Sequence, residues 1–361
     1  MEQSTQIVEV EKKEEQPKKP RKILTAMNAS FEIANGTVSI FKELFKTVKE
    51  AISDEIPFEI HQDKLVLRKM DASRIMMCDF VLNKEIFEEW HVWNGTKYKP
   101  AELPIRIVVP LGEVIYAIED AGKDARVKFE VTTIFSAVKR PIRVKVYKPA
   151  KCPKCGLATT NNQLPRDKRG KKGNRYKCQC GWRGKVRVWE RTEKVTETEM
   201  LEESKIIITV SERTKDKFTV KIFEQSSEDI PLPIIDFDGK FKLVAKDFKG
   251  KLEKAAKKTD HIKIVGSEKE LALLGDSDYV GIDMRMNKGS DILLVAEAYG
   301  EQKAVYPLKE LINIMPKPTK PSVAEIVGIE YTTDRPMRVT WFTNLDTSTI
   351  TFYLAPRIET E

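Results

Sequence analysis

Four of the five cysteines gather in one segment, in two close pairs that suit a metal site. Cys152 and Cys155 form a Cys-x-x-Cys pair, and Cys178 and Cys180 form a Cys-x-Cys pair after 22 intervening residues. A glycine follows each pair, which relieves the backbone where amides turn towards a thiolate sulfur. This pattern favours one structural Zn²⁺ held by four thiolates with no open ligand position, over redox or disulfide chemistry. Cys78 stands alone in an apolar predicted strand, where we expect a buried and inert thiol.

The same segment carries most of the positive charge. Residues 139–187 hold 17 lysines and arginines and one acidic residue, whereas the whole chain has a net charge of only +8. A basic loop held by metal, with Trp182 and Trp189 nearby, could bind phosphates and stack on an unpaired base. The alternatives are an insert whose lysines only keep it in solution, or contact with an acidic protein. The side chains assigned here to nucleic-acid binding are Arg166, Lys168, Arg169, Lys171, Lys172, Arg175 and Arg183.

Lysines on two predicted helices form a second candidate nucleic-acid surface. The first helix runs from about residue 38 to 52 and the second from 245 to 259, each with one apolar face. Cations on one face of a rigid helix can contact phosphates without reading base sequence. The alternative is a solvated helix face. The lysines concerned are Lys42, Lys46, Lys49, Lys251, Lys254, Lys257 and Lys258.

No combination of residues indicates catalysis. His61, His91 and His261 are dispersed, and the sequence has no glycine-rich loop that would cradle phosphates. Asp236-Phe-Asp238-Gly lacks the remaining parts of a kinase. We therefore predict a binding protein and not an enzyme.

The elements that must position these groups occur in the same order twice. The first round has the helix at 38–52, short alternating strands and a helix with Leu111, Val114, Ile115 and Ile118 on one face. The second round has the helix at 245–259, more strands and a helix with Leu308, Leu311, Ile312 and Met315 at the same spacing. The strands are expected at 57–60, 64–69, 74–81, 105–109, 205–211, 218–223, 240–244, 261–265, 271–274, 279–286, 292–298, 324–331, 337–342 and 350–354.

Two such rounds predict an α+β protein with duplicated domains, each with helices on one face of an antiparallel sheet. Residues 1–26 are expected to be a disordered charged tail. The first domain spans 27–225 and is interrupted by the zinc-ribbon insert at about 134–203. A polar and proline-punctuated connector at 226–237 leads to the second domain, 238–361.

Composition limits the class of protein further. The 361 residues are 41% hydrophobic and 33% charged, which is typical of a folded chain with a sizeable core. No apolar run approaches the roughly 18 residues that a membrane helix needs, and the first residues are polar and charged. We expect an intracellular protein of the cytoplasm and nucleoid, or of the nucleus, that is neither secreted nor membrane-bound.

Two short motifs resemble a known family. Lys69-Met-Asp-Ala-Ser-Arg-Ile75 and Tyr353-Leu-Ala-Pro-Arg-Ile358 look like the Met-Asp-x-Ser and C-terminal Leu-Ala-Pro stretches of the proliferating cell nuclear antigen (PCNA) type of DNA sliding clamp. They stand at opposite ends of the duplicated region. The resemblance covers about 28–133 and 204–361 and leaves the tail and the insert unexplained.

The resemblance implies a ring. Three identical or related subunits of two domains each would close around duplex DNA, with helices lining the hole and sheets forming the wall. The ring would act as a processivity factor that tethers DNA polymerase and other replication or repair enzymes, and the zinc ribbon would add contacts to DNA or to a partner. By similarity, the strand near 218–223 of one subunit would pair with the strand near 279–286 of the next.

The resemblance also implies a pocket for partner peptides beside the connector. Carried over position by position, its residues are Met70, Arg74, Ile75, Leu232, Ile234, Pro336, Tyr353, Ala355 and Pro356.

One helix departs from the family. The second helix of the first domain is usually basic there, but here it carries Glu113, Glu119 and Asp120. The alternative hypothesis is therefore a clamp-derived transcription or recruitment factor that does not encircle DNA and binds DNA or a polymerase through its basic ribbon.

Overall fold

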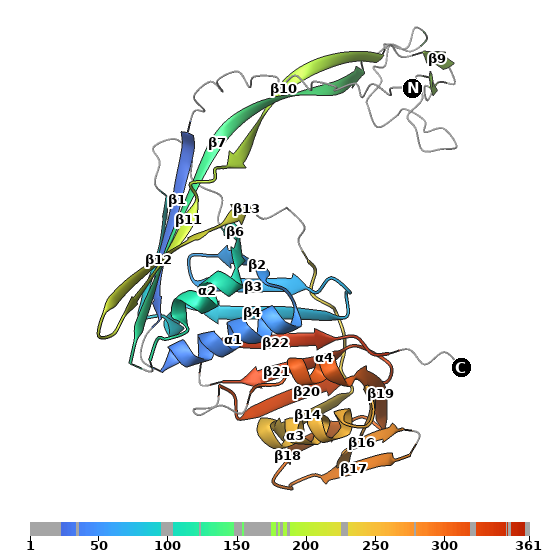
Figure 1. Ribbon diagram of the computed structural model, residues 1–361. Coiled ribbons are helices and arrows are strands. Elements are labelled where there is room, and N and C mark those ends of the chain that lie inside the picture. Colours follow the sequence, from blue (N-terminus) through green and yellow to red (C-terminus); the bar gives the residue numbers. More distant parts are fainter. Residues whose placement is uncertain are drawn as a thin grey trace, which may run out of the picture. The chain divides into compact units, whose positions relative to one another are not determined.

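The computed structural model describes residues 23–33, 36–94, 104–122, 124–147, 154, 175–177, 180, 183–185, 188–224, 230–277, 279–317, 323–343, 345 and 348–357 (Figure 1). Contacts divide the chain into two compact units. One includes Ser136–Glu199, and the other comprises Leu24–Phe135 and Met200–Glu361. The two repeats predicted from the sequence both lie in the second of these units.

The first repeat contains two helices and most of two sheets. Its helices are α1 (Thr37–Ala51) and α2 (Leu111–Ile118). Its strands are β1 (Ile23–Ile33), β2 (Glu55–Ile60), β3 (Lys64–Met70), β4 (Met76–Asn83), β5 (Glu89–Asn94), β6 (Ile105–Pro110), β7 (Arg126–Tyr147), β11 (Lys205–Ser211), β12 (Lys215–Lys221) and β13 (Phe223–Glu224), with a short 3₁₀ helix at Lys84–Ile86. Between β7 and β11 the chain forms β8 (Arg175–Lys177), β9 (Arg183–Lys185) and β10 (Val188–Met200).

The second repeat follows the same order. Its helices are α3 (Ala245–Ala256) and α4 (Leu308–Asn313). Its strands are β14 (Gly239–Val244), β15 (His261–Gly266), β16 (Glu270–Asp276), β17 (Gly281–Asn287), β18 (Leu293–Ala298), β19 (Gln302–Pro307), β20 (Ile326–Tyr331), β21 (Met337–Phe342) and β22 (Thr349–Leu354).

The strand order shows the duplication directly. One sheet of the first repeat has the order β12-β11-β7-β1-β5, and the second repeat has β22-β21-β20-β14-β18. The other sheets are β6-β2-β3-β4 and β19-β15-β16-β17. Because β4 pairs with β22, one sheet of each repeat joins into a ten-stranded sheet, which β13 completes beside β6. The predicted α+β fold of duplicated domains is thus confirmed.

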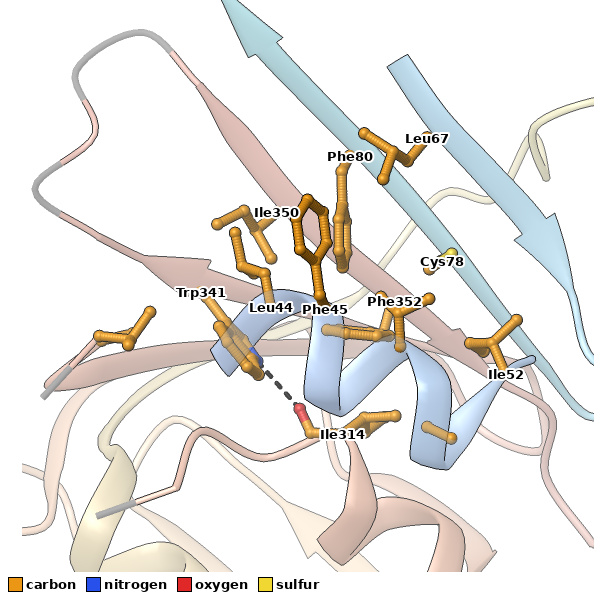
Figure 2. Packing of buried hydrophobic residues seen from close by; sticks show 14 of the residues in the cluster. Leu44, Phe45, Ile52, Leu67, Cys78, Phe80, Ile314, Trp341, Ile350 and Phe352 are labelled. Carbon is orange, nitrogen blue, oxygen red and sulfur yellow. Dashed lines mark hydrogen bonds between the residues drawn. The ribbon is translucent and has the colours of Figure 1, made fainter. Parts of the chain in front are cut away.

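The junction between the repeats is packed tightly under α1. Leu44 and Phe45 of α1 are buried over β4 and β22, where the Phe80 and Phe352 rings meet edge to face at 5.1 Å (Figure 2). Trp341 of β21 is also buried, and its Nε1 donates a hydrogen bond to the Ile314 carbonyl at 2.9 Å. Removing such a buried aromatic side chain costs about 3–5 kcal/mol. The junction is therefore part of the core and not a flexible hinge.

Several predicted strand boundaries were wrong. β1 begins at Ile23, inside the predicted tail, since it pairs with β5. β4 begins at Met76 and not at Arg74, because Arg74 has a φ of 60° and lies in a turn. β1, β5 and β19 were not predicted as strands at all. β7, which was not predicted as a strand, runs to Tyr147, beyond the predicted start of the insert at about 134.

Candidate functional site

The lysines of α1 are engaged with neighbouring groups of the same repeat. Lys42 is half-buried, and its Nζ donates hydrogen bonds to the carbonyls of Glu119 at 2.7 Å and Ala121 at 2.5 Å. Burial lowers the pKa of Lys42, and the neighbouring Lys46 ammonium lowers it further. Lys42 therefore caps the C-terminal end of α2, where helix carbonyls lack intrahelical donors.

The other two α1 lysines form ion pairs. Lys46 Nζ lies 3.4 Å from a Glu119 oxygen, and Lys49 Nζ lies 3.3 Å from Asp54 Oδ1. These exposed pairs are weak, but they place a carboxylate beside each ammonium. A phosphate approaching this face would meet positive charge that is already partly neutralised.

The predicted helix at 245–259 ends earlier, since α3 ends at Ala256, and the lysines of α3 and of the turn after it are different. Lys254, Lys257 and Lys258 are exposed and Lys251 is half-buried. Within the part of the chain that the structure describes, none of the four makes a hydrogen bond or ion pair. Lys257 and Lys258 also border a cavity of about 510 Å³ between the ends of α3 and α4, together with Lys309. Asp260 also lines this cavity, but the three lysines outnumber it, so the surface presents net positive charge to solvent.

One α3 lysine has an internal role that the sequence analysis missed. Lys249 is buried, and its Nζ donates to the Met315 carbonyl at 3.2 Å and to the Pro316 carbonyl at 3.4 Å. Burial lowers its pKa. Phe-Lys occurs at the same place in both first helices, as Phe41-Lys42 and Phe248-Lys249. Alignment of the two repeats would have predicted this second helix cap.

The acidic character of α2 is visible at the surface. Glu113, Glu119 and Asp120 are exposed, and so is Tyr116. Tyr116 and Asp120 border a cavity of about 490 Å³ that also contacts Phe218 of β12. The Tyr116 and Phe218 rings meet edge to face with centroids 6.1 Å apart. An open cavity with an acidic and aromatic lining thus lies beside the edge strand β12.

The predicted zinc site falls almost entirely outside the described residues. Cys152, Cys155 and Cys178 lie outside them, and Cys180 lies in a turn between β8 and β9. These strands form an antiparallel hairpin in which Lys177 pairs with Arg183. Among the described residues no group of three metal-ligating side chains occurs, but only Cys180 of the four cysteines is among them. The spacing of the four cysteines in the sequence still favours one structural zinc, and the metal site stays a prediction.

Most of the basic loop of the insert also lies outside the described residues. Arg175 and Arg183 belong to β8 and β9. The other residues of this set lie outside the described residues: Arg166, Lys168, Arg169, Lys171 and Lys172.

Strand pairing brings part of the predicted partner pocket together. In β3, β4, β22 and β21, register places Met70 opposite Met77, Met77 opposite Tyr353 and Tyr353 opposite Arg338. The Ala355 amide donates to the Ile75 carbonyl at 2.8 Å. The two family-like motifs, 280 residues apart in the chain, thus lie side by side.

A tight turn presents Arg74 and Ile75 at the surface. Asp71 Oδ1 accepts hydrogen bonds from the Ile75 amide at 2.8 Å and the Met76 amide at 2.7 Å. This turn holds Arg74 in the left-handed region and leaves Ile75 exposed. Such a conformation needs local support in a residue other than glycine.

In the described part of the connector, 230–237, the anchoring contacts lie at its C-terminal end. Thr332 Oγ1 accepts a hydrogen bond from the Asp238 amide and donates one to the Asp236 carbonyl, both at 3.0 Å. Leu232 and Ile234 are exposed, and no hydrogen bond or ring contact in the described part of the chain joins them to the Met70–Tyr353 group. Pro336 and Pro356 are half-buried near the strand ends. The structure therefore assembles the strand half of the predicted pocket but does not show the connector closing it.

No helix in the described part of the chain is long and apolar enough to cross a membrane.

The fold is that of PCNA-type sliding clamps. Residues 30–94 match the N-terminal domain of proliferating cell nuclear antigen. A DNA polymerase sliding clamp of Thermofilum pendens is 21% identical over 308 residues, which cover 85% of this chain and 92% of that protein.

Solved structures agree on the fold. A PCNA2–PCNA3 complex of Sulfolobus tokodaii superposes with a TM-score of 0.60 at 17% identity, covering 91% of this chain and all of the compared chain. PCNA of Thermococcus kodakaraensis gives the same TM-score and coverage at 15% identity. The chain has the PCNA-type clamp fold, and its resemblance to this family, expected from two short motifs, is confirmed.

Proposed function

We propose that the chain is a subunit of a ring-shaped sliding clamp that encircles duplex DNA and tethers a DNA polymerase or other replication and repair enzymes. The observation that carries the proposal is the set of lysines on α3 and the turn after it, which have no ion-pair partner within the described part of a chain with a PCNA-type fold. Lysines on a helix bind phosphates by charge alone, so the contact is independent of base sequence and allows sliding. The function is binding and needs no catalytic group.

Assembly is supported by two of the sheet edges. β12 ends one sheet and β17 ends another, so within the described part of the chain each has one side without a strand partner. Edges of this kind are sites for pairing with another chain. A compared structure is a complex of two different PCNA chains, so a ring of identical and one of related subunits are both compatible with this proposal.

The zinc ribbon is proposed to add contacts on the rim. Four cysteine thiolates would hold one Zn²⁺ with structural effect, and the net charge of +16 over residues 139–187 favours nucleic acid as its partner. The group at Met70, Ile75 and Tyr353 is proposed to receive peptides from clamp-binding enzymes, with Leu232 and Ile234 of the connector beside it.

A second function is favoured by a specific observation. The α1 lysines are paired internally and α2 is acidic, so half of the helical face lacks free positive charge. A recruitment factor that binds through its ribbon and does not encircle DNA would need no basic lining.

Topology distinguishes the two functions. The full chain, with a clamp loader if one is needed, is incubated with a nicked circular plasmid and separated from free protein by gel filtration. A clamp stays on the circle and is lost when a restriction enzyme linearises it. Replacing residues 140–200 by a short turn should leave this retention largely intact. Loss of all binding in that variant, with equal binding of the full chain to circles and linear DNA, would establish the recruitment factor instead.

A further inference from the structure

The chain contains an internal template for the contact between its copies. Within one chain β4 of the first repeat pairs with β22 of the second. Strand order makes β17 the counterpart of β4, and β12 the counterpart of β22. Both counterparts are edge strands. The kind of pairing that β4 and β22 form inside the chain is therefore still available to β17 and β12. Such a head-to-tail contact closes into a ring if the rotation permits.

Matching rows of residues fix the register of this equivalence. Across one pair of sheets, the row Phe218, Ile208 and Phe129 corresponds to Phe352, Val339 and Ile329. Across the other pair, the row Phe58, Leu67 and Phe80 corresponds to Ile264, Leu273 and Met284. Both rows are continuous over three strands, so a shift by one residue would place buried side chains on the wrong face.

The register transfers directly to the open edges. Inside the chain Thr351 lies opposite Asp79, and Phe352 lies opposite Cys78. The counterparts between copies are Lys217 opposite Asp283, and Phe218 opposite Ile282. The first is a pair of opposite charges and the second is apolar, and both types stabilise antiparallel strands.

The burial of equivalent residues differs as this register predicts. Met77 and Asp79 of β4 are buried by β22, whereas Gly281 and Asp283 at the equivalent places of β17 are exposed. β17 thus has the exposure of a strand whose neighbour is missing.

The helices carry the more informative difference. Inside the chain α1 packs against α4, and Lys317 just after α4 forms an ion pair of 2.9 Å with Glu50 at the end of α1. The counterpart of Glu50, one residue beyond α3, is Lys257. The counterpart of Lys317, two residues beyond α2, is Asp120. At each of the two positions, the residue at the open edge therefore carries the charge opposite to that of its counterpart inside the chain.

We infer that Lys257 of one copy pairs with Asp120 of the next, and that this charge-reversed pair, with Lys217 and Asp283, makes the contact between copies specific. The inference rests on the proposed ring and identifies its partner as a second copy of this chain. Lys257 and Asp120 are both exposed, and neither forms an ion pair within the described part of the chain. Asp120 also lies at the open cavity beside β12, which a second copy would cover.

Charge reversal penalises the wrong pairings. Two wrong pairings of helices are possible. If α1 met α2, Glu50 would face Asp120, and if α3 met α4, Lys257 would face Lys317. Both combinations are like-charge contacts, which disfavour the competing pairings. The correct internal and external junctions are the two that bring opposite charges together.

A charge swap tests the pair without DNA. The full-length protein and its variants are compared by analytical ultracentrifugation at low salt. We expect Asp120→Lys and Lys257→Asp each to weaken association about fivefold per contact, and the double variant to regain most of the loss. Lys246→Asp, an equal change at the exposed start of α3, is the matched control and should leave association unchanged.

Disulfide trapping tests the register. Lys217→Cys combined with Asp283→Cys should link copies under mild oxidation, since directly opposite residues lie within disulfide distance. Lys221→Cys combined with Asp283→Cys is four residues out of register and should not link them.

The outcomes separate this inference from the proposed function. Rescue by the double swap together with in-register trapping supports it. A wild-type chain that assembles, but shows no rescue or links in the shifted register, overturns the inference and leaves the ring in place. A wild-type chain that stays monomeric at all concentrations overturns a second copy as the partner. Retention on circular DNA then decides the proposed function separately.

Discussion

The two helix pairs have the same architecture but use their lysines differently. In the first repeat, Lys42, Lys46 and Lys49 reach carbonyls or carboxylates of neighbouring segments. In the second repeat only Lys249 turns inward, and the other α3 lysines face solvent. The difference indicates that a lysine-rich helix keeps free positive charge only where neighbouring segments place no carboxylate or carbonyl within reach of its ammonium groups. In this protein the DNA surface is predicted to lie mainly on α3.

Removing matched pairs of lysines gives the largest expected effect. Lys254→Ala with Lys258→Ala should lower affinity for duplex DNA about tenfold at moderate salt and reduce its salt dependence, because free phosphate contacts are lost. Lys46→Ala with Lys49→Ala should change affinity less than about twofold, since these charges are already paired. Fluorescence anisotropy with a short duplex at several salt concentrations measures both. Lys257 is left unchanged because of its inferred role between copies.

Equal losses from the two double variants would remove the proposed difference between the helix pairs. A larger loss from the α1 variant would reverse it.

The two lysines that cap helices, Lys42 and Lys249, should also differ in how much they stabilise the protein. Lys249→Met should destabilise the protein by about 1–3 kcal/mol, because two carbonyls in a buried place lose their donor. Lys42→Met should cost about 1 kcal/mol or less, because water can reach the half-exposed carbonyls at the end of α2. Urea unfolding of both variants gives the two free energies. A Lys42 variant at least as destabilised as the Lys249 variant would contradict the difference in burial.

The smallest effect on the stability of the repeats is expected from zinc loss in the insert, which interrupts only the first repeat. All four predicted zinc ligands lie within 136–199, which belongs to a unit separate from the repeats. A strong chelator should therefore remove one zinc per chain and unfold this unit, while the melting temperature of the repeats shifts by less than about 2 °C. Calorimetry with a zinc assay, repeated after zinc is added back, provides the measurement and its control. Collapse of the entire protein on zinc loss would show that the insert supports the repeats.

The sequence predicted the elements with strong periodicity. The apolar spacing in Phe41, Phe45 and Val48 identified α1 to within a residue at each end, and the same spacing identified α3. It did not predict β1 or β5, which pair with each other. Edge and first strands depend on ladder partners far along the chain, which local patterns do not report.

The candidate site was predicted unevenly for the same reason. Lys254 and Lys258 could be placed on an outward helix face from spacing alone. Lys42 and Lys46 were assigned to the same role, yet their partners at Glu119 and Ala121 are more than 70 residues away. The inward direction of Lys249 was likewise not evident from its own helix, although alignment of the two repeats would have indicated it.

The sequence by itself determined the duplication, the helix faces and the kind of charge on each, because periodicity and composition are local properties of the chain. Only the tertiary structure decided which lysines remain free, which sheet edges remain open and which charges face each other at the junction of the repeats. Those outcomes depend on helices and strands that meet through the sheets, and an ion pair exists only where the fold brings its two charges within a few ångströms.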